Sequence, residues 1–171
     1  MHPRVRKIRA VRRLRRLLQL NRLVRNERGI QLVELAIVLP VFVLLFAATA
    51  EFGRYFYEYT TLAKASRAGA RYLVTAAVNN TEDTAAKNIV VYGNAGGSGS
   101  PIINGLDRSH VVITRTGGVP VLPQTVSVQI SGFKHQPLFD LGKITNVPSL
   151  SLNIDVKPSV TMRYLLTQPA I

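Results

Sequence analysis

Residues 27–50, ERGIQLVELAIVLPVFVLLFAATA, are the stretch of this chain that decides its fold. Between residues 30 and 50 the only charged side chain is Glu34. As a helix these residues cover roughly 31 Å, which is about the thickness of the hydrocarbon core of a bilayer. The stretch therefore predicts one transmembrane helix over residues 30–50, with a basic tail before it and a folded domain after it.

Charge is unevenly distributed around this predicted span. The 171 residues carry a formal net charge of +13. Residues 1–29 hold 11 lysines and arginines and one glutamate, whereas residues 30–171 hold 11 basic and 8 acidic residues. The positive-inside rule then predicts a cytoplasmic N-terminus and an extracytoplasmic C-terminal domain. We expect the basic tail to lie on anionic lipid headgroups. A nucleic-acid interface is not expected, because no aromatic residue lies within the tail to stack on bases.

The apolar run is also compatible with other interpretations. Ala48-Thr49-Ala50 matches the A-x-A pattern of a signal-peptide cleavage site, so a secreted protein cut after Ala50 is one alternative. A plain anchor needs only apolar residues and does not explain Glu34. An ionised carboxylate is costly in hydrocarbon and commonly has a partner there, so Glu34 favours a helix that packs against other helices. A position at headgroup depth would also accommodate it.

Apolar residues continue at helical spacing after the span. They share one face of a helix, whose members are Phe52, Tyr55, Phe56, Tyr59, Leu62, Ala63, Ala70, Leu73 and Ala77. Lys64, Arg67 and Arg71 form a basic face beside it. We expect one helix over residues 30–78, with an amphipathic part at 51–78, roughly 73 Å long if straight. Asn79-Asn80 is predicted to end it.

Other side chains of this predicted helix lie within reach of one another. Arg54 is three residues from Glu51 and four from Glu58, and side chains at these spacings meet on a helix. The four aromatic residues between positions 52 and 59 are predicted to anchor the helix at the membrane surface and to pack on the sheet.

Residues 79–171 predict a small domain that contains strands. Apolar and polar residues alternate at 111–116, 125–131, 150–157 and 160–164, so strands are expected there. The other expected elements are a short helix from a cap at Thr81 to residue 88, a short strand at 89–92, a glycine-rich loop at 93–101 and an irregular loop at 132–148. The fold class is therefore α+β, a long N-terminal helix packed on a small antiparallel sheet.

Catalytic motifs are not found in the sequence. His2, His110 and His135 are far apart in the chain, and each is expected at the surface. Because the chain has no cysteine, it has no disulfide and no thiolate metal site. The glycine-rich loop lacks the Gly-Lys-Ser/Thr ending of a phosphate-binding loop. We therefore expect no enzyme activity, catalytic residue, cofactor, metal or small-molecule substrate.

Several motifs resemble those of a known family. Gly29 followed by IQLVE at residues 30–34 is similar to the processing site of type IV pilins and pseudopilins. Leu39-Pro40, EFGR at 51–54 and AGARY at 68–72 resemble the TadE-like family, which are minor pilins or pseudopilins of the tight-adherence (Tad, or Flp) pilus. Residues 149–153 and 160–164 are similar to the closing strands of that family. The chain departs from it at LLT, residues 165–167, where a polar or acidic ending is expected.

The resemblance implies a pilin-like fold and cleavage by a membrane prepilin peptidase between Gly29 and Ile30. Glycine lets the protease approach the backbone closely, because it has no side chain. Cleavage would remove ten net positive charges and leave a free amine on Ile30. Glu34 of one subunit could then neutralise the amine of a neighbour and set the register of the packed helices. Pro40 is expected to bend or loosen the helix, either as a packing feature or as a harmless kink.

The function implied is that of a minor pilin or pseudopilin in assembly of a Tad/Flp-type adhesion pilus or a related secretion apparatus. The implied partners are the prepilin peptidase, other pilins, the Tad assembly platform and membrane lipids. The implied location is the bacterial inner membrane, with incorporation into a surface pilus as an extension. Two alternatives stay open: a single-span scaffold with an external β domain that does not polymerise, and the secreted protein cut after Ala50.

Overall fold

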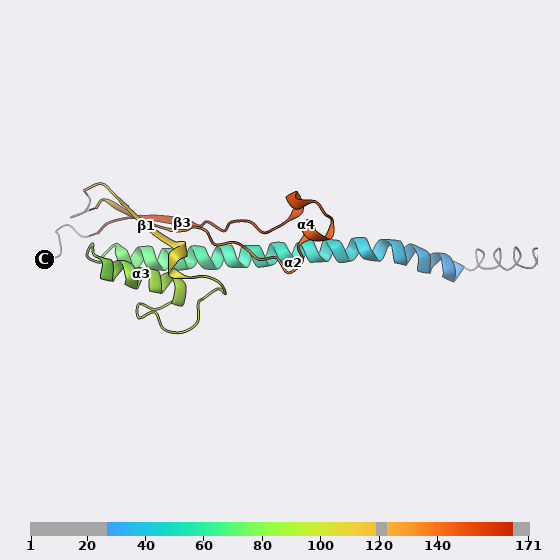
Figure 1. The fold of residues 1–171 in the computed structure, drawn as a ribbon, viewed down its shortest axis with the longest axis horizontal. Helices are drawn as coiled ribbons and strands as arrows, with labels where there is room; N and C mark the ends of the chain where they lie inside the picture. The colour runs from blue at the N-terminus through green and yellow to red at the C-terminus, as the bar shows by residue number, and fades with distance from the viewer. Residues whose placement is uncertain (1–26, 119–122, 166–171) are drawn as a thin grey trace, which may run out of the picture. The chain divides into compact units, whose positions relative to one another are not determined.

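The computed structural model describes residues 27–118 and 123–165. The predicted basic tail up to residue 26, the connection at 119–122 and the C-terminal residues 166–171 lie outside the described residues. The chain divides into two compact units, Met1–Ala47 and Ala48–Ile171. The elements follow one another as α2, α3, η1, β1, β2, α4, η2 and β3 (Figure 1). A long apolar helix and a small antiparallel sheet confirm the α+β class.

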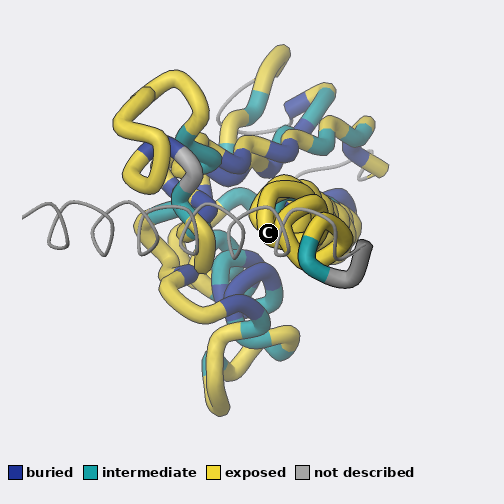
Figure 2. Tube along the Cα trace, turned by 90° about the vertical axis from the view of Figure 1, so that its right-hand side faces the viewer, coloured by how far each residue is buried: buried dark blue, intermediate teal, exposed yellow. Residues whose placement is uncertain are grey.

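Helix α2, Glu27–Leu73, contains the whole predicted span. Every side chain of residues 30–46 is exposed (Figure 2, yellow). Within the described part of the chain, Gly29–Leu73 is the helix that is long and apolar enough to cross a membrane. So large an exposed apolar surface is stable only against lipid or against other apolar helices. The first unit therefore has the properties of a membrane anchor.

Helix α2 ends at Leu73, before the predicted end at residue 78. The amide of Val74 still bonds to the carbonyl of Ala70, at 3.1 Å. The next two amides bond three residues back, to Tyr72 at 3.4 Å and to Leu73 at 3.3 Å, which is the tighter turn typical of a helix terminus. The prediction that Asn79-Asn80 ends this helix is therefore wrong.

Helix α3, Asn80–Tyr92, begins where the first helix was expected to end. The side chain of Asn79 caps it by accepting a hydrogen bond from the amide of Glu82 at 2.8 Å, so the predicted cap at Thr81 is wrong. Gly93 ends the helix in the left-handed region, at φ 75°. The strand expected at 89–92 is also wrong, because these residues complete the helix and bury Val90 and Val91.

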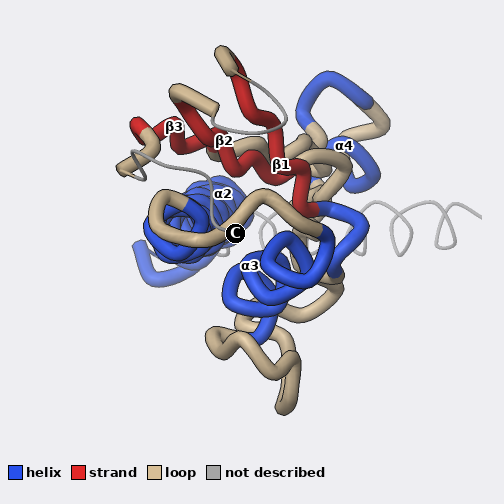
Figure 3. The backbone as a smooth tube through the Cα atoms, turned by 90° about the vertical axis from the view of Figure 1, so that its left-hand side faces the viewer, coloured by secondary structure: helices blue, strands red, loops and turns tan. Residues whose placement is uncertain are grey.

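Three antiparallel strands form the sheet, in the order β1-β2-β3. They are β1, Val111–Thr116; β2, Thr125–Ile130; and β3, Ser159–Arg163, close to three of the predicted strands. Val128 lies opposite Ile113 on one side and opposite Val160 on the other. The sheet covers α2 and α3 with one face (Figure 3), and Val126, Val128 and Ile130 of β2 are completely buried there.

The strand predicted at 150–157 does not form. This segment begins with the 3-10 helix η2, Pro148–Leu150, and pairs with residues 133–135 through one isolated bridge, Lys134 to Asp155. The amide of Val156 donates to the carbonyl of Phe133 at 2.9 Å, which brings one buried side chain into the core. Alternation alone is not sufficient for a strand, because a ladder also needs an extended partner.

The side of α2 that faces the domain is partly as predicted. Leu62, Ala70 and Leu73 are buried in the core, whereas Phe52 and Phe56 are exposed. The prediction that these aromatic residues form core for the sheet is therefore wrong for Phe52 and Phe56, and their role as interfacial anchors stays a prediction. The buried positions at the start of the domain are instead occupied by Glu51 and, less completely, Glu58.

Close packing and one ion pair fix α3 to the rest of the domain. A Cβ atom on Gly69 of α2 would lie 2.6 Å from Cγ2 of Val90, so only glycine permits this approach of the two helices. Arg115 of β1 donates from Nη1 to Oδ2 of Asp83 on α3 at 3.1 Å. This hydrogen bond raises the pKa of Arg115, whose side chain is 10% exposed.

Candidate functional site

The predicted processing residues lie at the start of α2. Gly29 is partly buried and Ile30 is exposed, and both have helical backbone. Glu34 lies about one turn further along and is exposed. No hydrogen bond or ion pair joins it to another described residue, so its carboxylate is open to a partner from outside the described residues. These residues keep their predicted roles as proposals, because the single chain places them without a partner subunit or a peptidase.

Pro40 and the basic face lie further along α2. Pro40 is inside the helix and exposed. It has no N–H, so the carbonyl one turn before it loses its helical hydrogen bond. Lys64, Arg67 and Arg71 are all exposed on the domain part of the helix. Their charges are therefore available to lipid headgroups or to an acidic partner.

A buried cluster that the sequence did not predict lies at the start of the domain. His135, which is completely buried, lies between two glutamates of α2. Its Nδ1 is 2.7 Å from Oε2 of Glu58, and its Nε2 is 3.3 Å from Oε2 of Glu51. Oε1 of Glu51 accepts the backbone amides of Leu138 at 2.8 Å and Phe139 at 2.9 Å. These three side chains, the Glu51–His135–Glu58 cluster, join residues 135–139 to the helix.

Glu51 has a cation and several hydrogen-bond donors around it. Both imidazole nitrogens of His135 face carboxylate oxygens of the cluster. Arg54 lies 3.4 Å from Oε2 of Glu51 and supplies a positive charge beside it. Burial raises the pKa of Glu51, but the amide of Phe139, His135, the amide of Leu138 and the charge of Arg54 together lower it below its ordinary value of 4.5. Glu51 is therefore held in its ionised form.

The expectation of a surface position for His135 is wrong. A signal for the cluster was present in the sequence, because residues 51, 55, 58 and 62 follow one another at steps of three and four along the helix face that Leu62 buries. Two carboxylates on a buried face need a cationic partner. The ring of Tyr55 packs edge-on to the imidazole, with the centroids 5.7 Å apart.

In this arrangement the cluster has a structural role. Both ring nitrogens of His135 already face carboxylate oxygens, which leaves neither free to accept a proton from a substrate or to bind a metal. Among the described residues, no group of three His, Cys, Asp or Glu side chains is arranged to hold a metal ion. The cluster therefore links α2 to residues 135–139 through hydrogen bonds.

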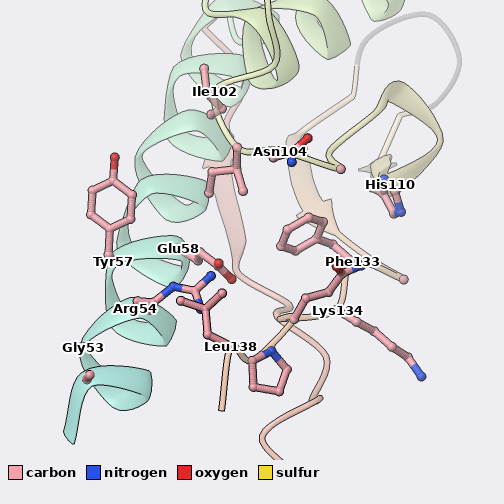
Figure 4. A pocket seen from close by; sticks show the side chains of 16 residues that line it. Gly53, Arg54, Tyr57, Glu58, Ile102, Asn104, His110, Phe133, Lys134 and Leu138 are labelled. Atoms are coloured by element: carbon pink, nitrogen blue, oxygen red, sulfur yellow. The ribbon is translucent and has the colours of Figure 1, made fainter. Parts of the chain in front are cut away.

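An open cavity of about 900 Å³ lies beside this cluster. Arg54, Tyr57 and Glu58 line it from α2, and Phe133 and Leu138 line it from the opposite segment (Figure 4). The other members of its lining are Ala50, Gly53, Ile102, Ile103, Asn104, Gly105, His110, Gly132, Lys134, Gln136 and Pro137. Aromatic, aliphatic and charged groups are mixed in it without a convergent set of polar atoms, so it does not define a ligand.

Comparison with protein families supports the motifs of the first helix. Residues 29–71 match the model of the family described as TadE-like protein, which confirms the resemblance for this segment. The match begins at Gly29 and ends two residues before the end of α2. It does not include residues 149–164, where the resemblance stays a prediction. No curated protein and no solved structure matches the chain.

Proposed function

Because residues 29–71 are TadE-like, we propose that this chain is a minor pilin or pseudopilin in the assembly of a Tad/Flp-type adhesion pilus or a related secretion apparatus. The observation that carries the proposal is the family match that begins at Gly29 and extends along one uninterrupted helix. Residues 30–46 of that helix expose apolar side chains, which lipid or the helices of other pilins would cover.

Processing by a prepilin peptidase between Gly29 and Ile30 is the first step of the proposal. It removes the basic tail and creates an amine next to the apolar surface. Glu34 has no partner among the described residues, and the new amine of a neighbouring subunit supplies one of opposite charge. A charge pair is stronger in a low-dielectric environment than in water, so this pair favours one axial register of neighbouring helices.

The proposed location follows from the charge distribution. The tail of residues 1–29 stays in the cytoplasm, residues 30–50 cross the inner membrane, and the domain lies outside. In this orientation Lys64, Arg67 and Arg71 face the extracytoplasmic side, where the assembly platform or other pilins can contact them. Incorporation into a surface pilus extends the same proposal.

Mass spectrometry of the protein purified from its own membranes tests the processing step. The expected mature chain begins at Ile30, and the chain from a strain without prepilin peptidase keeps its tail. A bulky substitution, Gly29→Leu, should prevent cleavage, whereas Gly53→Ala in the same helix should not. A chain that begins at Met1 in a strain with active peptidase, or at Glu51, contradicts the proposal.

The variant Glu34→Ala tests the assembly step separately. Its matched control is Gln31→Ala, which removes a polar side chain from the same exposed helix start. We expect Glu34→Ala to be processed but to co-purify with other pilins less than the control does. Unchanged co-purification of Glu34→Ala would contradict the role of Glu34 in assembly, whereas a chain that functions without binding other pilins would favour the scaffold that does not polymerise.

A further inference from the structure

Exposed apolar side chains of the second unit are concentrated in two segments. Of the described residues after Ala47, twelve large apolar or aromatic side chains are exposed, and ten of them lie in residues 52–59 or 138–154. The members of the two groups are Phe52, Phe56, Tyr57 and Tyr59, and Leu138, Phe139, Ile144, Val147, Leu150 and Ile154. Exposed apolar side chains that are gathered in this way indicate a contact surface, whereas single exposed apolar residues are common and need no explanation.

The second segment is held at the place where the predicted span ends. Glu51 directly follows the last residue of that span, and its carboxylate accepts the amides of Leu138 and Phe139. The segment continues through α4, Leu141–Ile144, which lies at the end of this unit opposite to the sheet (Figure 1). Leu138 is 72% exposed and Ile144 is 65% exposed, although the neighbouring amides are fixed.

We propose that residues 138–154 bind the surface of the bilayer, with Leu138 and Ile144 inserted among the lipid headgroups. This rests on the proposed span, because a membrane that ends near Ala50 lies beside any group bonded to Glu51. The aromatic residues at 52–59 have the composition of an interfacial belt. Lys143, whose side chain is 87% exposed and whose Nζ lies 4.0 Å from Oδ2 of Asp140, can turn its ammonium to the phosphates while its stem covers apolar surface. Continuity with the span thus favours lipid over a protein partner.

Single cysteines test the proposal, since the chain has none of its own. Leu138→Cys and Ile144→Cys each carry an environment-sensitive dye, in the full chain reconstituted into vesicles of phosphatidylcholine and phosphatidylglycerol at a low protein-to-lipid ratio. Leu138→Cys keeps the backbone amide that bonds to Glu51, and circular dichroism checks the fold of each variant. Val43→Cys reports on the span itself, and Ser100→Cys, in the exposed glycine-rich loop, reports on water.

We expect the dyes at residues 138 and 144 to have a blue-shifted emission. A quencher attached to lipid near the headgroup should lower it by about twofold or more relative to residue 100, because interfacial segments lie only ~5–10 Å deep. Residue 43 lies about 10 Å below the proposed end of the span at Ala50, so a quencher within the acyl chains reports on it. Quenching at residue 43 without quenching at 138 and 144 would overturn the inference and leave the span intact. No quenching at residue 43 by the acyl-chain quencher would remove the span and the inference with it. Shielding at 138 that lipid quenchers do not reach, and that grows with protein density, would overturn it in favour of a second copy.

Discussion

Replacement of His135 by alanine should destabilise the second unit more than any other histidine change. The imidazole is completely buried and bonds to Glu58 at 2.7 Å and to Glu51 at 3.3 Å. Its removal takes a hydrogen-bond partner from both carboxylates, and Glu51 keeps Arg54 and the amides of Leu138 and Phe139. A buried polar group that loses its partner costs about 1–3 kcal/mol, and more if it is charged, and two such groups lose one here. We therefore expect a loss of about 3–5 kcal/mol in the free energy of unfolding.

Thermal unfolding followed by circular dichroism, in detergent and with the full chain, measures this loss. For a domain of this size it corresponds to a decrease in Tm of roughly 10–20 °C. The matched control is His110→Ala, since His110 is partly exposed, accepts the amide of Asp107 at 3.1 Å and packs edge-on to Phe133, with the ring centroids 5.9 Å apart. The control should cost about 1 kcal/mol or less. Equal losses in the two variants would refute the argument that the cluster stabilises the domain.

The same variant should also change the response to acid. The pKa of Glu51 in the folded protein is below its ordinary value of 4.5. Its contribution to stability is therefore present above about pH 4.5 and is lost as the pH falls through the lower, folded value. Without His135 one of the groups that lower this pKa is missing, so the acid midpoint of unfolding should move to higher pH. A midpoint that stays at the same pH or moves lower contradicts this.

Three further substitutions, one of them with a matched control, follow from contacts within the domain. Asp83→Ala should cost about 2–3 kcal/mol in urea unfolding, because it leaves the guanidinium of Arg115 buried without its carboxylate. Gly69→Val should cost about 1–3 kcal/mol by overpacking against α3, whereas Gly53→Ala, where a Cβ meets nothing within 4 Å, should be neutral or slightly stabilising in the same assay. Asn79→Ala removes the cap of α3 and should lower Tm by an amount equivalent to about 1 kcal/mol, and an unchanged Tm would contradict the cap.

Local sequence patterns correctly predicted the structure of segments that depend mainly on residues near them in the chain. Apart from Gln31 and Glu34, the residues between 30 and 46 are almost all apolar, which indicates a span without knowledge of the rest of the chain. Alternation located β1 and β2 because these strands pair with each other across a short connection. Alternation at 150–157 was misleading, since the segment beside it, residues 133–135, supplies only one bridge.

Long-range contacts explain what the sequence could not predict. His135 appeared isolated because its partners are 77 and 84 residues away in the chain. Phe52 and Phe56 fit the same helix period as Leu62, but the chain folds against the side that carries Glu51 and Glu58. The roles proposed for Gly29, Ile30, Glu34 and Pro40 involve a peptidase and other subunits, which a single chain does not contain.

Glu51 and His135 are far apart in the sequence, so the ribosome makes them at different times. The ribosome makes the histidine 84 residues after the glutamate, which takes about 4–17 s at about 5–20 residues per second. During that interval the two acids have no imidazole beside them. Hydrated carboxylates next to an apolar segment resist entry into hydrocarbon. We therefore expect the two acids to favour an end of the proposed span at Ala50 before they become part of the folded domain.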